Sequence, residues 1–274
     1  MTKKPENAET GINRLLDIMR QLRDPETGCP WDREQSFETI APYTIEEAYE
    51  VAETIADGDM DEFCNELGDL LFQVVFYARI AAEKKLFDFN DVVQGISDKM
   101  VTRHPHIFGN EDIEDAEAQN VAWETSKARE REAKARAKNR EPSVLDDVTA
   151  GFPALMRAQK LQKRATRIGF DWPDVTGALD KLEEEVAELN DEVQSGVDQT
   201  RINEEFGDVM FSLVNIGRHY KLDVETSLRQ ANTRFETRFR LMETLARDNH
   251  GDPTTASLEE LEALWQVAKQ ELSD

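Results

Sequence analysis

Residues Glu66–Ala78 read ELGDLLFQVVFYA, in which two acids three residues apart stand beside a long apolar run. Residues Glu205–Gly217 read EFGDVMFSLVNIG and repeat this arrangement 139 residues later. Residues three apart lie on one face of a helix, so the two carboxylates of each pair are neighbours. The stretch therefore predicts a buried helix with acids at its rim, present in two copies.

Further motifs recur in the same order in each half of the chain. GCPW (Gly28–Trp31) and EEAYE (Glu46–Glu50) precede the first acidic pair, and GFDW (Gly169–Trp172) and EEVAE (Glu184–Glu188) precede the second. The acidic pair begins 16 residues after EEAYE and 17 residues after EEVAE. A basic pair four residues apart follows in each half, Lys99 with Arg103 and Arg234 with Arg238. Matched order and spacing indicate two diverged copies of one domain.

The charged stretch KAREREAKARAKNR, residues 127–140, marks a boundary between the copies. It has almost no apolar side chains and is typical of a solvated helical extension or linker. We therefore expect an N-terminal domain over 1–125, a charged linker over 126–149 and a C-terminal domain over 150–274.

Composition narrows the class of protein. The 274 residues carry a formal charge of −24 from 57 acids and 33 bases, which disfavours binding to nucleic acid or to anionic membranes. No run reaches the ~18 apolar residues of a membrane span, and the N-terminal residues lack the apolar core of a signal peptide. The two cysteines, Cys29 and Cys64, form no disulfide framework. These features predict a cytoplasmic protein.

Helical periodicity runs through the chain, and strand signals are almost absent. Ile12–Leu22 has an amphipathic pattern, and Thr44 before an acid three residues on predicts a helix start by a capping box. Gly58 and Gly196 are expected to end the helices that carry the first acids. Two long helices should follow them, over Asp61–Ala82 and Gln199–Tyr220. The predicted fold is all-α, a tandem pair of four-helix-bundle-like domains.

The acids form two predicted metal sites if neighbouring helices run antiparallel. The expected ligand sets are Glu47, Glu50, Glu66 and Asp69 in the first copy, and Glu185, Glu188, Glu205 and Asp208 in the second. Carboxylates beside an apolar core need compensation, which a cation provides. All-oxygen ligands favour Mg²⁺, with Mn²⁺ as a substitute. Gly68 and Gly207 would permit close helix approach or simply serve helix packing.

Phosphate would have to be bound by the metal and by basic side chains, because the chain has no P-loop and no G-x-G-x-x-G motif. A base of the second copy stands one turn before each acidic motif. Trp265 could stack on a nucleobase, although on periodicity alone such a tryptophan more often packs in a core or an interface. The candidates are Lys181, Arg201, Arg234, Arg238, Trp265 and Lys269.

At these residues the sequence resembles the MazG nucleoside triphosphate pyrophosphohydrolases over nearly its whole length. The resemblance includes RLLDIMRQLRDPETGCPWDREQSF, APYTIEEAYEV, NELGDLLFQVVFYA, SDKMVTRHPHIF, and PALMRAQKLQKRA leading into GFDW. It implies hydrolysis of a nucleoside triphosphate such as ATP to the monophosphate and pyrophosphate, with Mg²⁺ bound by the motif acids. It also implies a homodimer and a four-helix-type bundle, with the C-terminal copy as the catalytic one.

The resemblance assigns roles by motif in the second copy. It makes Glu185, Glu188, Glu205 and Asp208 the metal ligands and places Lys181–Glu185, Arg201–Glu204, Arg234–Arg238 and Trp265 along the nucleotide. Family members often have Lys where this chain has Arg201 and Arg234, which bears on substrate preference because Arg binds phosphate in a fork. Glu184 or Glu204 would assist the attacking water.

Three readings remain open on the sequence alone. The first is a nucleoside triphosphate pyrophosphohydrolase with broad, housecleaning specificity. The second is a narrow dUTP or dCTP hydrolase that uses the same chemistry. The third is a non-catalytic helical protein that holds a structural metal and interacts with partners.

Overall fold

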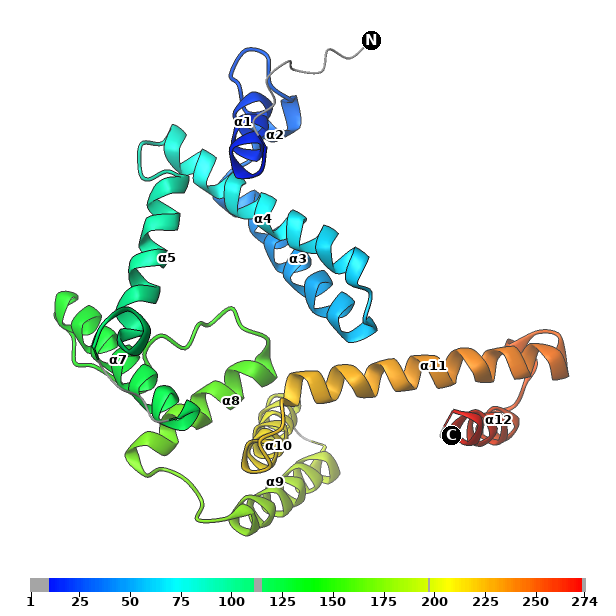
Figure 1. The fold of residues 1–274 in the computed structure, drawn as a ribbon. Coiled ribbons are helices and arrows are strands. Elements are labelled where there is room, and N and C mark those ends of the chain that lie inside the picture. Colours follow the sequence, from blue (N-terminus) through cyan, green and yellow to red (C-terminus); the bar gives the residue numbers. More distant parts are fainter. Residues whose placement is uncertain (1–9, 111–114, 197, 273–274) are drawn as a thin grey trace. The chain divides into compact units, whose positions relative to one another are not determined.

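The computed structural model describes residues 10–110, 115–196 and 198–272 (Figure 1). Every regular element within these ranges is a helix, which confirms the predicted all-α class. The chain divides into two compact units, a first unit over Met1–Trp123 and a second unit over Glu124–Asp274. None of the helices in the described ranges has the length and apolar character needed to span a membrane.

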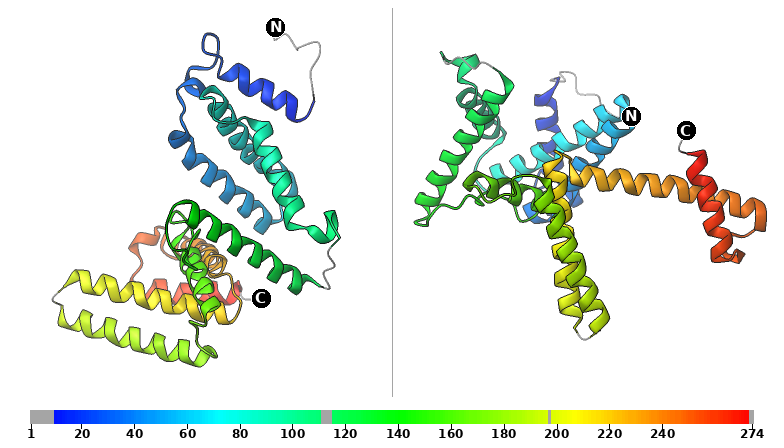
Figure 2. Two further views of the ribbon diagram at one scale, coloured as in Figure 1. Left: turned by 90° about the vertical axis from the view of Figure 1, so that its left-hand side faces the viewer. Right: turned by 90° about the horizontal axis from the view of Figure 1, so that it is seen from below.

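The first unit is built around an antiparallel pair of long helices, α3 and α4, against which α1 packs (Figures 1 and 2). Its helices are α1 Ile12–Leu22, α2 Pro30–Glu34, α3 Phe37–Asp57, α4 Met60–Glu83, α5 Phe89–Arg103 and α6 Pro105–Phe108. The helix predicted over Asp61–Ala82 is α4, which is one residue longer at each end. The apolar run of ELGDLLFQVVFYA therefore lies on a helix that faces α1 and α3.

A hydrophobic cluster holds α1, α3 and α4 together. Met19 of α1, Ile40 of α3 and Val75, Phe76 and Ile80 of α4 form it, each no more than 1% exposed. Met19 is buried because the amphipathic pattern of α1 directs one face of that helix toward α4. Burial of such side chains contributes about 1.5–3 kcal/mol each to folding, which fixes the α3–α4 hairpin in place.

Glycine ends the two helices that carry the first acids of each unit, as predicted. Gly58 follows α3 with φ 75°, and Gly196 follows α9 with φ 63°, both in the left-handed region that favours glycine. Asp59 then caps α4 by accepting a hydrogen bond from the backbone N–H of Glu62 at 3.0 Å. The turn is therefore tight enough to return the next helix antiparallel to the last.

The predicted helix start at Thr44 is wrong. α3 begins at Phe37, because Ser36 and Thr39 form the capping box, with the Thr39 hydroxyl accepting from the Ser36 backbone N–H at 2.8 Å. Thr44 lies inside the helix, where its hydroxyl donates to the Ile40 carbonyl at 3.4 Å. Pro42 also lies inside α3. The helix therefore tolerates the loss of one backbone hydrogen bond, because proline has no N–H to donate.

The second unit repeats the long-helix pair, as α9 and α10, and has four further α-helices in its described residues. Its elements are α7 Ala116–Ala137, which crosses the division between the units, α8 Ala154–Ala165, a short 3₁₀ turn at Thr166–Ile168, α9 Val175–Ser195, α10 Gln199–His219, α11 Val224–His250, a 3₁₀ turn at Pro253–Thr255, and α12 Leu258–Glu271. Most of the basic stretch 127–140 is helical, as part of α7. Two of its residues, Arg131 and Ala135, are buried.

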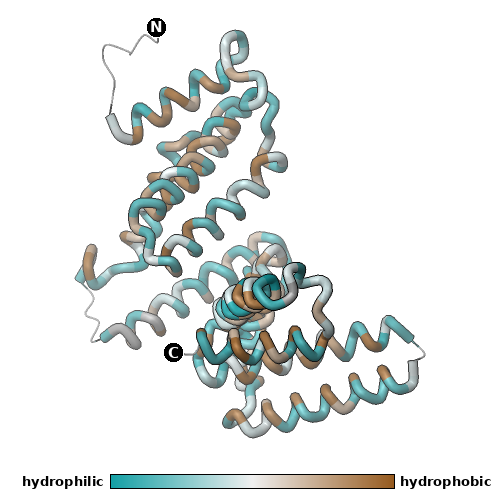
Figure 3. The backbone as a smooth tube through the Cα atoms, turned by 90° about the vertical axis from the view of Figure 1, so that its right-hand side faces the viewer, coloured by the Kyte–Doolittle hydropathy of each residue, from teal (hydrophilic) through white to brown (hydrophobic). Residues whose placement is uncertain are grey.

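α9 and α10 form an antiparallel hairpin, and α8 packs against α10 as α1 packs against α4 in the first unit (Figure 2). α12 packs against α11. Hydrophobic and hydrophilic positions alternate along these helices, as Figure 3 shows, which is the pattern of amphipathic helices. The second unit thus places its acidic motifs on facing helices, in the same order as the first.

Gly68 and Gly207 do not mark close approach between helices within a unit. A Cβ atom added at either position would meet no other atom within 4 Å. The expectation that a missing side chain lets a neighbouring helix approach is therefore wrong for the single chain, because the backbone at both glycines faces open space.

Candidate active site

Three carboxylates converge between α9 and α10 of the second unit. Glu185 of α9 and Glu205 and Asp208 of α10 offer ligand oxygens that all lie within 4.8 Å of one another. We call these three residues the second acidic cluster. Glu185 and Glu205 are only 6% and 5% exposed, whereas Asp208 is open to solvent. The Gly196 turn produces this arrangement, because it folds α10 back along α9 with the acids at the same level.

Two basic side chains neutralise part of this charge. The Lys181 ammonium lies 2.8 Å from Glu185, and the Arg201 guanidinium lies 2.6 Å from Glu205. Both bases stand one helical turn before the acid they contact, the spacing that brings side chains of one helix together. The predicted placement of Lys181 and Arg201 beside the acids is therefore what the structure shows.

The carboxylates of the second acidic cluster are only partly compensated by the two basic side chains. Burial raises the pKa of Glu205; Arg201 lowers it, and the carboxylates of Glu188, Asp208 and Glu185 raise it again. The pKa of Lys181 is raised by its hydrogen bonds to Glu184 and Glu185. A net increase in the pKa of Glu205 means that its ionised form lacks compensation, which a bound cation would supply.

Glu188, the fourth predicted ligand, lies outside the tight group of three, although it acts on Glu205 through its charge. The two proposed catalytic acids are exposed. Glu184 accepts from Lys181 at 2.8 Å, and Glu204 accepts from Arg201 at 3.0 Å. Each is therefore held at the surface by the same base that contacts the buried acid.

The first unit holds a similar group without the bases. Glu47 of α3 and Glu66 and Asp69 of α4 offer oxygens within 4.8 Å of one another, and we call them the first acidic cluster. Burial and then the charges of Asp69 and Glu50 raise the pKa of Glu47. Burial, followed by the charge of Glu50, also raises the pKa of Glu66. Glu50 itself lies outside the tight group.

The two clusters differ at the positions one turn before their acids. Lys181 and Arg201 stand there in the second unit, while Tyr43 and Glu62 stand at the matching positions of the first. Glu62 adds a further acid and raises the pKa of Glu66 by hydrogen bonding to it. The first cluster can thus attract a cation, but it lacks the bases that would contact a polyphosphate.

The donor set of the second cluster fits a hard divalent cation. All three ligands are carboxylates on two rigid helices, and two of them are buried, so a metal would compensate charge that solvent cannot reach. Cysteine and histidine, which zinc and iron sites usually recruit, do not belong to either group among the described residues. The acids of both clusters are therefore able to hold Mg²⁺ or Mn²⁺.

The downstream basic and aromatic residues lie elsewhere in the second unit. Arg234 and Arg238 are on α11, and Trp265 and Lys269 are on α12. Trp265 packs against Phe235 of α11, with ring centroids 5.3 Å apart. α11 runs away from the α9–α10 hairpin in Figure 1, and α12 packs against it. Within one chain, the structure does not bring these residues to the second acidic cluster.

Comparison with known proteins agrees with this architecture. The domain model described as the MazG nucleotide pyrophosphohydrolase domain matches twice, over residues 35–108 and 175–240. Each match contains one of the two helix hairpins and its acidic cluster. The chain belongs to the MazG family. The second match includes Arg234 and Arg238 on α11 but ends before Trp265 and Lys269.

Relatives in several bacteria are similar over more than half of this chain. A nucleoside triphosphate pyrophosphohydrolase of Escherichia coli (strain K12) is 48% identical over 264 residues, 96% of this chain and 98% of the relative. A nucleoside triphosphate pyrophosphohydrolase/pyrophosphatase MazG of Thermotoga maritima is 39% identical over 95% of this chain and 97% of its own length. A Mycolicibacterium smegmatis nucleoside triphosphate pyrophosphohydrolase is 38% identical over 57% of this chain and 47% of its own length.

Some residues of this MazG chain were missed by sequence reasoning. Arg218 of α10 binds Asp171 in the GFDW turn, with one nitrogen–oxygen pair at 2.9 Å, and so fixes that turn against the helix. This pairing is long-range, and no periodicity in the sequence indicates it. The contrast between the bases Lys181 and Arg201 and their first-unit counterparts was visible in the sequence once the two copies were aligned.

Proposed function

We propose that the second unit hydrolyses nucleoside triphosphates to the monophosphate and pyrophosphate in a Mg²⁺-dependent reaction. Mn²⁺ would substitute for Mg²⁺. The observation that carries this proposal is the placement of Lys181 and Arg201 beside the second acidic cluster. A structural metal site needs acids alone, whereas a polyphosphate site also needs bases that bind the phosphate oxygens.

In the proposed mechanism Glu185, Glu205 and Asp208 hold the metal, and Glu188, which lies outside this group, adds negative charge near it. Bound Mg²⁺ supplies neutralisation of the polyphosphate and activation of a water molecule. Substrate phosphate would displace Lys181 and Arg201 from the acids that they contact in the free chain. The two cations would then stabilise the charge that develops on the departing pyrophosphate.

Glu184 and Glu204 are the proposed proton acceptors for the attacking water. Both are exposed, so substrate and water can reach them, and each is held 2.8–3.0 Å from a base that also faces the cluster. When the substrate draws Lys181 or Arg201 toward phosphate, the adjacent carboxylate is released to accept a proton.

We further propose a cytoplasmic homodimer with broad nucleotide specificity. Because Arg234, Arg238, Trp265 and Lys269 lie away from the cluster within one chain, a role for them at the nucleotide requires that a second copy supply them. The first acidic cluster would be a weak or structural metal site, since Tyr43 and Glu62 replace the bases there.

The proposal predicts the products and the metal dependence. Incubation with a nucleoside triphosphate and Mg²⁺ should release pyrophosphate and no orthophosphate, and chelation should abolish release because the carboxylates alone repel the substrate. Phosphorus NMR of the reaction mixture separates the two products. Added Mg²⁺ should restore turnover, and a panel of ribo- and deoxyribonucleotides should be used at rates within about tenfold of one another, or roughly 1.4 kcal/mol.

Two results would contradict this account. Orthophosphate as the first product would place the cleavage at the γ-phosphate instead. A chelator that lowers the melting temperature, in a chain that never turns over a nucleotide with Mg²⁺ present, would indicate a purely structural metal. Turnover confined to dUTP or dCTP would agree with the proposed reaction but would contradict the proposed broad nucleotide specificity.

A further inference from the structure

A cavity of about 610 Å³ lies in the first unit between the C-terminal end of α1, the GCPW turn with α2, and the C-terminal end of α4. Most of its lining is charged, and three arginines against two glutamates give that lining a net positive charge. This sign is opposite to that of the whole chain, whose formal charge is −24. The charged residues of the lining are Arg23, Arg33, Glu34, Arg79 and Glu83.

Arg23 builds the wall of this cavity. Its Nε and Nη2 atoms bind the Glu83 carboxylate at 3.1 and 2.7 Å. Its Nη1 atom donates to the carbonyl of Asp32 and, at 3.2 Å, to the carbonyl of Gln35. The Arg23 side chain is only 7% exposed. Arg23 therefore ties α1 to α2 and α4, and its charge offsets that of Glu83.

Arg79 of α4 differs from Arg23 in having donors to spare. It donates to Glu83 through Nε alone, at 2.8 Å. Among the residues that the structure describes, its two Nη nitrogens have no hydrogen-bond partner. Because Arg23 already offsets the charge of Glu83, the guanidinium of Arg79 brings an excess positive charge to the cavity wall.

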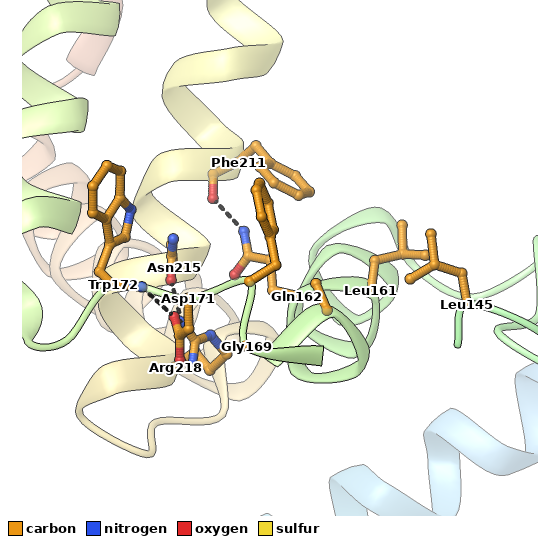
Figure 4. Close-up of a pocket in the computed structure, with 11 residues that line it drawn as sticks. Leu145, Leu161, Gln162, Gly169, Asp171, Trp172, Phe211, Asn215 and Arg218 are labelled. Atoms are coloured by element: carbon orange, nitrogen blue, oxygen red, sulfur yellow. Dashed lines mark hydrogen bonds and ion pairs between the residues drawn. The ribbon is translucent and has the colours of Figure 1, made fainter. Parts of the chain in front are cut away.

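The second unit shows what neutralises the corresponding arginine there. Arg79 and Arg218 each stand ten residues after the last acid of their cluster. Arg218 binds the carboxylate of Asp171 in the GFDW turn, with one nitrogen–oxygen pair at 2.9 Å (Figure 4). The matching residue of the GCPW turn is Pro30, which has no carboxylate. The first unit has therefore kept the arginine and lost its acidic partner.

Arg33 of α2 supplies a second basic side chain to the same cavity. The acid that feels its charge is Asp24, and hydrogen bonds from Thr27 contribute more than Arg33 to the lowered pKa of that carboxyl. Glu34, the acid of the lining that Arg23 does not contact, is exposed, so solvent screens its charge. Arg33 and Arg79 therefore remain as the cationic groups on α2 and α4.

We propose that this cavity binds a phosphate-bearing anion, with the guanidinium groups of Arg33 and Arg79 as its ligands. Two guanidinium groups offer forked pairs of N–H donors, which match the oxygen atoms of a phosphate. The lining contains no aromatic side chain, so it offers no stacking surface for a nucleobase, and recognition depends on the phosphate. Inorganic phosphate, pyrophosphate and the phosphate group of a nucleotide share this chemistry. The inference does not depend on the proposed function, because neither arginine contacts an acidic cluster.

Isothermal titration calorimetry in EDTA tests the proposal, with orthophosphate, pyrophosphate and AMP titrated separately at constant ionic strength. Without a divalent cation the acidic clusters repel phosphate, whereas the arginine-lined cavity still attracts it. At least one of the three anions should bind, and Arg79→Gln and Arg33→Gln should each weaken that binding at least about tenfold. Arg14→Gln, which removes the same charge at an exposed position of α1 outside the lining, should leave the affinity within about twofold.

The tightest ligand of the three identifies the source of the phosphate. Binding of orthophosphate or pyrophosphate indicates a free inorganic anion, and binding of AMP alone indicates a nucleotide. No binding of any of them to the wild-type chain, or an unchanged affinity in either arginine variant, would overturn the proposal. Absence of nucleotide turnover would refute the proposed function and leave this site standing.

A measurement on the wild-type chain covers the case in which Arg79→Gln fails to fold. Phenylglyoxal, which modifies accessible arginines, is applied in EDTA with and without the anion that binds most tightly, and the modified peptides are identified by mass spectrometry. Slower modification of Arg33 and Arg79 in the presence of the anion supports the site. Unchanged modification of both, with protection confined to other arginines, overturns it.

Discussion

Glu205→Gln should lower the rate of pyrophosphate release by about a thousandfold, the order of loss seen when a central electrostatic group is removed from an active site. Glu205 is 5% exposed and shares the group of three carboxylates with Glu185 and Asp208. Glutamine keeps the shape of the side chain but contributes no negative charge to a cation. Mg²⁺ affinity and turnover should therefore fall together.

The substitution should not unfold the protein. Burial and neighbouring acids raise the pKa of Glu205, so its negative charge is unfavourable in the folded chain without a cation. A carboxyl whose pKa is raised on folding lowers the free energy of unfolding at pH values above that pKa, because its ionised form is less favourable in the folded chain. Replacing it by a neutral amide therefore costs no stability at neutral pH. Circular dichroism and the melting temperature should accordingly match those of the wild type without Mg²⁺.

Glu66→Gln is the matched control, since Glu66 holds the same place in the first acidic cluster. It should leave pyrophosphate release within about threefold, because the first cluster has Tyr43 and Glu62 where the second has its bases. Loss of activity in Glu66→Gln with retention in Glu205→Gln would assign catalysis to the first unit and reverse the proposed roles.

Phe76→Ala should destabilise the first unit by about 3–5 kcal/mol, the usual cost of removing a buried phenylalanine. Phe76 is 1% exposed, contacts Phe72 edge-on at a centroid distance of 5.9 Å, and lies 5.4 Å from the Arg23 guanidinium carbon. Arg23 is itself buried and binds Glu83 at 2.7 Å. The alanine would leave a cavity beside this ion pair as well as beside the apolar cluster.

Hydrogen exchange resolved by peptide measures this effect in the intact chain, whose two units need not unfold together. Protection in the most stable peptides of α1 and α4 should fall by about two to four orders of magnitude, while peptides of α9 and α10 keep theirs. Leu67→Ala, at an exposed position of α4, should change protection by less than about tenfold. A comparably small change for Phe76→Ala would show that this core does not hold the first unit together.

Much of this fold could be predicted from local patterns. The amphipathic spacing of α1 and the glycines at Gly58 and Gly196 indicated helix ends that the structure confirms. The position of the acids relative to those turns predicted that four carboxylates converge in each unit, and the structure brings three of each four within 4.8 Å of one another. The start of α3 was misplaced because Ser36 and Thr39 cap it without the acid that a typical capping box contains.

The cavity of about 480 Å³ between α8, the GFDW turn and α10 could not be predicted in the same way. It depends on how α8 lies against α10 and on the ion pair between Asp171 and Arg218, which are 47 residues apart. Hydrophobic periodicity reports which face of a helix is buried and carries no information about such pairings.

Hydrolysis in water enriched with oxygen-18 tests the central claim most directly. The wild-type chain is incubated with a nucleoside triphosphate and Mg²⁺, and the products are examined by mass spectrometry beside Glu185→Ala and Glu47→Ala. We predict that the label enters the nucleoside monophosphate, that pyrophosphate is unlabelled, and that Glu185→Ala alone abolishes the reaction. Label in orthophosphate with a diphosphate as the other product, or abolition by Glu47→Ala alone, would contradict the account.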